Sequence, residues 1–123
     1  MKREWVRTNP LWIIGNVNKP WAFSQAHIEP YNLGIQWQSN KKAWMTADIF
    51  IEWLRAFDIQ MSGRNVLLLL DNFSAHQSAV DQINSELKHI TIIWLPPNST
   101  TKYQPLDQGT IRAWKAIWKR SWV

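Results

Sequence analysis

Apolar residues recur with helical spacing in residues 46–58. They stand at i, i+3, i+4 and i+7, which places them on one face of a helix: Phe50, Trp53, Leu54 and Phe57. Thr46 is suited to cap the first turn, and the carboxylate of Asp48 interacts favourably with the helix dipole there. The pattern therefore predicts a helix over residues 46–58 with one buried face.

Two other stretches are apolar with little or no interruption. Residues 66–70 are one valine and four leucines, and residues 90–95 are rich in β-branched and aromatic side chains. Short runs of this kind, bounded by polar residues, are typical of strands that are covered on both faces. We therefore predict two buried strands, at 66–70 and at 90–95.

Weaker patterns complete the expected order of elements. We predict short strands at 11–15 and 34–37, a connection without regular structure at 16–33, and helices at 77–87 and 107–120. The residues expected to face inward on these two helices are Val80, Ile83 and Leu87, and Ile111, Trp114 and Trp118. From residue 46 onward helices and strands alternate, which predicts an α/β fold with a parallel or mixed sheet.

Composition narrows the class of protein. The 123 residues are enough for one domain rather than two, and the net charge of +5 permits binding to a polyanion without identifying one. The absence of cysteine excludes disulfides, zinc–thiolate sites and thiol catalysis. No apolar run approaches the roughly 18 residues of a membrane helix, so we expect no membrane partner. Ten tryptophans exceed what so small a core easily covers, so we expect some to be exposed.

Two acidic residues stand at positions suited to ion binding. Asp71 follows the first apolar run, and Asp107 opens the last predicted helix. If the strands at 66–70 and 90–95 are parallel neighbours, both carboxylates reach the sheet edge where α/β folds bind ligands. Carboxylates there favour Mg²⁺ or Mn²⁺ over zinc, and two such ions support phosphodiester cleavage. The alternative is that Asp71 is a turn residue and Asp107 caps its helix. Five other acidic residues are interpreted as helix-surface charges: Asp48, Glu52, Asp58, Asp81 and Glu86.

Several blocks of sequence resemble one family. Residues 71–76 (DNFSAH) resemble a signature that follows the fourth strand of ribonuclease-H-like transposases. Residues 95–101 and 104–109 (LPPNSTT and QPLDQG) and residues 40–46 and 50–54 (NKKAWMT and FIEWL) are similar to blocks of the pogo, Tigger and jerky group of DDE transposases. Residues 10–15 and 18–20 also resemble that group. The resemblance covers roughly residues 9–120, which assigns 9–123 to a partial DDE catalytic core and leaves 1–8 unassigned.

The resemblance implies a fold, a reaction and a set of ligands. The fold is ribonuclease-H-like, and the reaction is metal-dependent DNA strand cleavage and transfer with Mg²⁺ or Mn²⁺. Asp71 corresponds to the second acidic ligand and Asp107 to the third. The first lies upstream in the family, and no Asp precedes Asp48 here. Neither Glu4 nor Glu29 ends a predicted buried strand. We therefore expect a core that lacks its first strands, lacks the helix-turn-helix region of the family, and does not cleave DNA alone.

Other polar residues have two interpretations each. The resemblance places His76 near the metal site, where it would donate a hydrogen bond to a ligand or transfer a proton; the alternative is a polar residue at the start of a helix. Asn72 is a candidate to orient Asp71 or to contact a metal-bound water, with a turn role as the alternative. Gln108 and Gln104 flank the third carboxylate and are candidates to support the metal site or to contact the phosphate backbone, with loop and first-turn solvation as the alternative. Six basic residues are candidates for nucleic-acid binding, with solvated surface as the alternative: Lys41, Lys42, Lys102, Arg112, Lys115 and Lys119.

Four hypotheses about function remain open at this stage. The chain is part of a DDE endonuclease domain that binds DNA, or it is a domesticated, non-catalytic DNA-binding protein. A third hypothesis is a protein-interaction module that pairs with a full-length transposase or with itself. A fourth is that the chain alone does not fold stably. The family resemblance places the protein in the nucleus.

Overall fold

The computed structural model describes residues 10–97, 104, 106 and 109–121. The elements are strand β1 (Leu11–Gly15), helix α1 (Trp21–Ala26), 3₁₀-helix η1 (Pro30–Leu33), β2 (Ile35–Ser39), α2 (Ala47–Gln60), β3 (Val66–Leu70), α3 (Ser74–Ile83), 3₁₀-helix η2 (Asn84–Glu86), β4 (Ile90–Trp94) and α5 (Thr110–Arg120). The expected α/β class with parallel strands is confirmed. The strands at 11–15, 66–70 and 90–95 and the helix from residue 46 lie within one or two residues of their predicted positions, and β2 extends two residues beyond the strand expected at 34–37.

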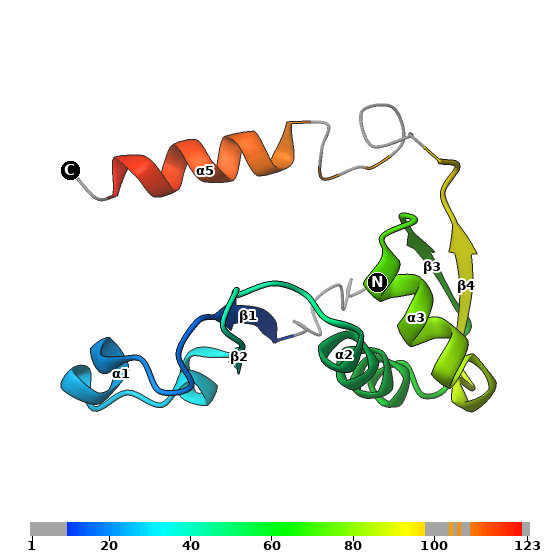
Figure 1. Cartoon of the computed structure of the whole chain (residues 1–123), viewed down its shortest axis with the longest axis horizontal. Helices are drawn as coiled ribbons and strands as arrows, with labels where there is room; N and C mark the ends of the chain where they lie inside the picture. Colours follow the sequence, from blue (N-terminus) through cyan, green and yellow to red (C-terminus); the bar gives the residue numbers. More distant parts are fainter. Residues whose placement is uncertain (1–9, 98–103, 105, 107–108, 122–123) are drawn as a thin grey trace, which may run out of the picture.

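The strands form two separate parallel pairs. β1 pairs with β2, with Ile13 opposite Trp37, and β3 pairs with β4, with Leu68 opposite Ile92. In Figure 1 the β1–β2 pair lies to the left of α2 and the β3–β4 pair to its right. Because parallel strands need a crossover, each pair is joined by a helical connection. The carboxyl ends of β3 and β4 therefore lie side by side.

The core lies between α2, α3 and one face of the β3–β4 pair. Its most deeply buried large side chains are Leu54 of α2 and Ile83 of α3, which are fully covered or nearly so. The apolar stripe predicted for α2 supplies Phe50 and Leu54 to this core. The Thr46 hydroxyl accepts a hydrogen bond from the Ile49 amide at 3.3 Å, so the predicted N-cap is confirmed.

The connection at 16–33 is more regular than predicted. It contains α1 and η1, two short helical segments of six and four residues. Segments this short leave no periodic signal in the sequence, and Pro20 and Pro30 lie at their N-terminal ends, where a fixed φ is compatible with a helix. His27, at φ 52°, ends α1 in the left-handed conformation.

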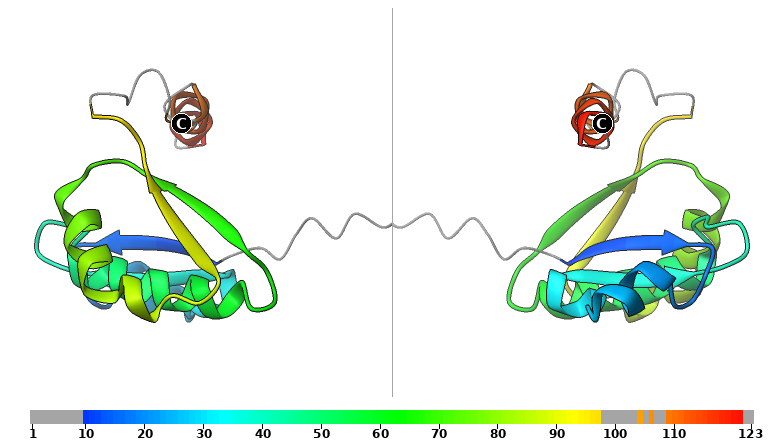
Figure 2. Two further views of the ribbon diagram at one scale, coloured as in Figure 1. Left: turned by 90° about the vertical axis from the view of Figure 1, so that its right-hand side faces the viewer. Right: turned by 90° about the vertical axis from the view of Figure 1, so that its left-hand side faces the viewer.

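The prediction that β3 and β4 are covered on both faces was wrong. Leu68 and Leu70 face α2 and α3, whereas Leu67 and Leu69 on the opposite face are 65% and 54% exposed. Ile93 of β4 is exposed on that face as well. Figure 2 shows α2 and α3 on one side of this strand pair only. A continuous apolar run shows that both faces are suited to burial, but it does not supply the element that covers the second face.

The last two helices also differ from expectation. α3 begins at Ser74 and ends at Ile83, so Leu87 lies beyond it. α5 begins at Thr110 and lies above the β1–β2 pair in Figure 1, to the upper left of the β3–β4 pair, and its apolar residues do not face inward as predicted. Trp114 and Trp118 stack on each other at 5.6 Å and are each about half exposed. The expectation of exposed tryptophans is confirmed by these two, and by Trp21 and Trp44.

Asp58 is not the surface charge that was predicted. Only 9% of the residue is exposed, and its carboxylate accepts hydrogen bonds from the backbone amides of Lys88 (3.1 Å) and His89 (2.8 Å). The last turn of α2 is thereby tied to the residues that lead into β4.

Candidate metal and nucleic-acid site

Asp71 is the first residue after β3, at the carboxyl end of the β3–β4 pair. The backbone amide of Leu95 donates to the Leu70 carbonyl at 2.7 Å, so the two chains remain paired up to this edge. The Asp71 side chain is 38% exposed. Its carboxylate is therefore accessible from solvent at the position where parallel α/β sheets bind their ligands.

The imidazole of His76 contacts this carboxylate directly. The distance from His76 Nδ1 to Asp71 Oδ1 is 2.7 Å. In the tautomer that has its proton on Nδ1, the ring donates this hydrogen bond to the carboxylate. The ring packs against Phe50 of α2 at 4.4 Å and against Phe73 at 5.2 Å between centroids. Two aromatic rings and a carboxylate thus fix His76 in the first turn of α3.

Asn72 connects the ends of the two strands. Its side-chain amide donates to the Leu95 carbonyl at 3.0 Å. Leu95 directly precedes Pro96 and Pro97, so this bond fixes the point where the chain leaves β4. The Asn72 side chain supports the rim of the site and reaches across it to the other strand.

Gln104, which follows β4 in the sequence, contacts Asp71. Its amide nitrogen lies 3.4 Å from Asp71 Oδ2, at the outer limit for a hydrogen bond. Gln104 stands three residues before Asp107. Asp107, Gln108 and Lys102 lie outside the described residues. Within the part of the chain that the structure describes, no group of three or more His, Cys, Asp or Glu side chains gathers to hold an ion.

The candidate basic residues fall in two places. Lys41 and Lys42 are exposed in the loop between β2 and α2, and Arg112, Lys115 and Lys119 are exposed on α5. The structure does not bring these two groups together, because α5 stands apart from the rest of the chain in Figure 1.

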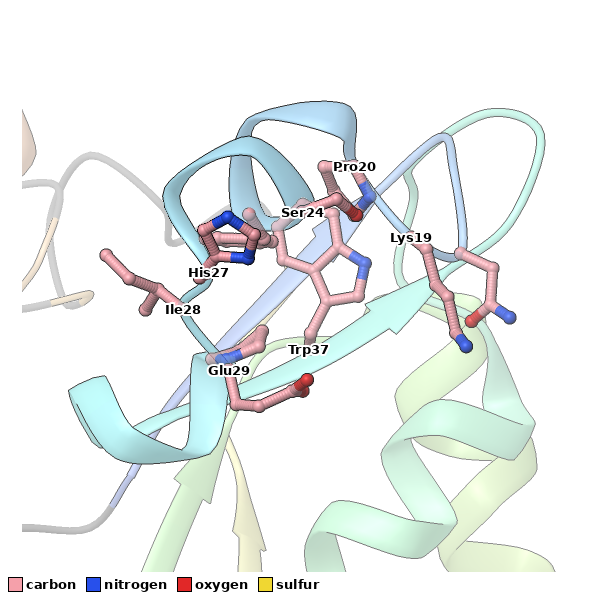
Figure 3. Close-up of a pocket in the computed structure, with 10 residues that line it drawn as sticks. Lys19, Pro20, Ser24, His27, Ile28, Glu29 and Trp37 are labelled. Atoms are coloured by element: carbon pink, nitrogen blue, oxygen red, sulfur yellow. The ribbon is translucent and has the colours of Figure 1, made fainter.

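A cavity that the sequence did not indicate lies between β2 and the segment that contains α1. It has a volume of about 620 Å³, and Figure 3 shows Trp37 at its centre, with His27 and Glu29 to one side and Lys19 to the other. The Trp37 indole donates to the Val17 carbonyl at 3.1 Å. None of the residues around Asp71 lines this cavity. It is therefore separate from the carboxylate site.

Gly15 is required by the same tryptophan. A Cβ at this position would overlap the six-membered ring of Trp37. The close approach of β1 to Trp37 therefore depends on the absence of a side chain at residue 15.

None of the helices in the described ranges has both the length and the apolar character that a bilayer crossing requires.

Comparisons with known proteins agree over most of the chain. The model of the DDE superfamily endonuclease family matches residues 6–123. Over 117 residues the chain is 44% identical to CENP-B homolog protein 2 and 42% identical to ARS-binding protein 1, both of Schizosaccharomyces pombe. These alignments cover 93% of this chain but only 23% and 22% of those proteins.

A mammalian protein is also similar. Tigger transposable element-derived protein 4 of Mus musculus is 30% identical over 108 residues, which is 86% of this chain and 19% of that protein. No solved structure matches the chain. The chain thus spans less than a quarter of the length of the relatives it matches.

Proposed function

Because this chain belongs to the DDE superfamily endonuclease family, we propose that it forms part of a domain that binds DNA and processes it with divalent ions. The mixed α/β architecture with parallel strands agrees with the ribonuclease-H-like fold that the family implies. In this proposal residues 9–123 belong to the catalytic core, and the ion site lies at the carboxyl end of β3 and β4.

The contact between Gln104 and Asp71 carries this proposal. Asp71 and Gln104 are separated by 33 positions, yet their side chains lie 3.4 Å apart. Gln104 belongs to the block that also contains Asp107 and Gln108. The contact supports a site in which Asp71 and Asp107 approach each other from the two strand ends.

The side chain of Asp71 is chemically suited to Mg²⁺ or Mn²⁺. Its oxygens are hard donors, which these ions prefer, and the carboxylate is accessible. Asp71 and Asp107 would hold the ion, His76 would orient Asp71, and Asn72 and Gln108 would support the rim. A bound divalent ion supplies activation of the attacking water or hydroxyl and stabilisation of the leaving oxygen.

The first acidic ligand of the family's triad is an aspartate, and this sequence has no Asp before Asp48. Divalent-ion affinity depends on the number of charged ligands. We therefore expect this chain by itself to bind such an ion weakly and not to cleave DNA.

DNA is the partner that the exposed basic residues favour. Lys41 and Lys42 in one place, and Arg112, Lys115 and Lys119 in another, would contact phosphates, and Lys102 would add to them. The nucleus is the location consistent with this partner. DNA binding without cleavage is a second candidate function, which the name of the relative ARS-binding protein 1 favours. In that case the proposed protein partners are a full-length transposase, which would bring in the first acidic ligand, or a second copy of this chain, which would not.

Mn²⁺ binding tests the ion site directly. Paramagnetic broadening of NMR signals under Mn²⁺ titration should centre on His76 and Gln104 and should disappear in Asp71→Asn and in Asp107→Asn. The matched control is Asp81→Asn, because Asp81 is an exposed carboxylate on α3. Broadening that is equal in Asp71→Asn and in the native chain would refute the site.

A nicking assay with Mg²⁺ or Mn²⁺ separates the two candidate functions. Cleavage by the native chain that is lost in Asp71→Ala would establish catalysis by this chain alone. Salt-dependent DNA binding without cleavage is the outcome expected here.

A further inference from the structure

A single side chain holds the loop between β2 and α2. Asn40 Oδ1 accepts hydrogen bonds from the backbone amides of Lys42 at 3.1 Å and Trp44 at 3.3 Å. Asn40 Nδ2 donates a hydrogen bond to the Trp44 carbonyl at 2.7 Å. The backbone amide of Asn40 donates a hydrogen bond to the Gly15 carbonyl at 3.1 Å, which ties the loop to β1. Ala43 has a positive φ of 54°, a conformation that costs energy for a non-glycine residue. The loop is therefore a fixed structure.

This fixed loop presents an aromatic ring to solvent. Trp44 is 65% exposed although both its backbone amide and its carbonyl are bonded to Asn40. The Lys42 ammonium lies 5.4 Å from the centroid of the indole, and Lys41 is exposed beside it. A flat ring next to two positive charges is the combination that binds a nucleobase and the adjacent phosphates.

The loop leads into α2, and α2 contacts the Asp71 site through Phe50 and His76. Trp44 precedes the N-cap Thr46 by two residues, and Phe50 follows Thr46 by four residues, about 6 Å along the helix axis. The Phe50 ring packs on His76, and His76 contacts Asp71. Figure 2 shows the loop that enters α2 and the connection from β3 into α3 on the same side of the molecule.

We propose that Trp44 stacks on an unpaired base of a DNA strand whose backbone passes the Asp71 site, with Lys41 and Lys42 at the neighbouring phosphates. The proposal rests on the function proposed above, since that function brings a DNA strand to this rim. Inside a duplex both faces of each base are stacked, so a base can stack on the exposed indole only where the DNA is single-stranded or locally opened. Asn40 is the positioning residue that holds the ring in place.

Fluorescence anisotropy with a labelled single-stranded 12-mer, in EDTA and at low salt, tests the proposal. Trp44→Ala should weaken binding about tenfold, because base–aromatic stacking is lost, whereas Trp44→Phe should stay within about threefold. The control is Trp21→Ala, which removes a tryptophan that is 73% exposed on α1, and it should leave affinity unchanged. Lys42→Gln should lower the dependence of log K on log salt by about 0.7.

A 2-aminopurine base in the same oligonucleotide reports stacking itself. Its fluorescence should be quenched on binding to the native chain and to Lys42→Gln at saturation, but not to Trp44→Ala. Equal affinity in Trp44→Ala and Trp21→Ala, equal dependence on Trp44 with a matched duplex, or no binding at low salt would each overturn the proposal. Because EDTA removes divalent ions, this result is independent of the Mn²⁺ titration, and the ion site can fail while the Trp44 contact holds.

Discussion

Replacing Asp58 tests whether the buried carboxylate holds α2 to the start of β4. In Asp58→Ala the backbone amides of Lys88 and His89 lose their acceptor. A hydrogen bond to a charged group contributes about 1.5–3 kcal/mol. Lys88 is exposed, so water replaces part of its bond, whereas His89 is half-buried. We therefore expect Asp58→Ala to lower the free energy of unfolding by about 3 kcal/mol, towards the low end of two such bonds.

Urea denaturation followed by circular dichroism measures this loss. With a slope near 2 kcal/mol/M, the midpoint should fall by about 1.5 M while the slope stays constant. Asp81→Ala removes an exposed carboxylate from α3 and should change stability by less than about 0.5 kcal/mol. If Asp58→Ala and Asp81→Ala have the same midpoint, the carboxylate does not stabilise this connection and the reasoning is wrong.

Three further substitutions probe the core, a backbone contact and the ion site. Leu54→Ala, at a fully buried position, should lower the free energy of unfolding measured in urea by about 2–5 kcal/mol. Leu67→Ala, at an exposed position, should lower it by less than about 0.5 kcal/mol, and similar losses in the two variants would contradict a core on one face only. Gly15→Ala should destabilise by about 1–3 kcal/mol because its Cβ overlaps the facing indole, and an unchanged melt would show that the two strands can separate freely. His76→Ala should weaken Mn²⁺ binding by about tenfold or more in a calorimetric titration, while His27→Ala should leave it unchanged; equal affinities would remove His76 from the site.

Local patterns predicted the elements that depend on local spacing. The stripe that contains Phe50 and Leu54 predicted α2, and the run at 66–70 predicted β3, because each signal lies within one element. The exposure of Leu67 and of the apolar residues of α5 depends on what packs against them, which the sequence of the element itself does not contain. The helix at 21–26 has only six residues, less than two turns, and is too short to produce a period.

The candidate site was predictable in part from short blocks of sequence. The block at 71–76 indicated Asp71 and His76 as neighbours, and the structure brings them to 2.7 Å. The roles of Asn40 and Asp58 could not be seen in the same way, because their partners are backbone amides. Those of Asp58 are 30 and 31 positions away, and backbone groups carry no signature in the sequence.

The parallel pairing of β3 and β4 has a kinetic consequence. Gln104 can contact Asp71 only after α3 has formed its crossover and β4 has paired with β3. The contact therefore joins residues that are far apart in the sequence, and such contacts form slowly. The entropy cost of closing such a loop arises before the contact can stabilise the fold, whereas α2 can form from contacts among its own residues. During refolding, helical ellipticity should therefore return before the capacity to bind Mn²⁺, which makes ion affinity a late marker of the native state.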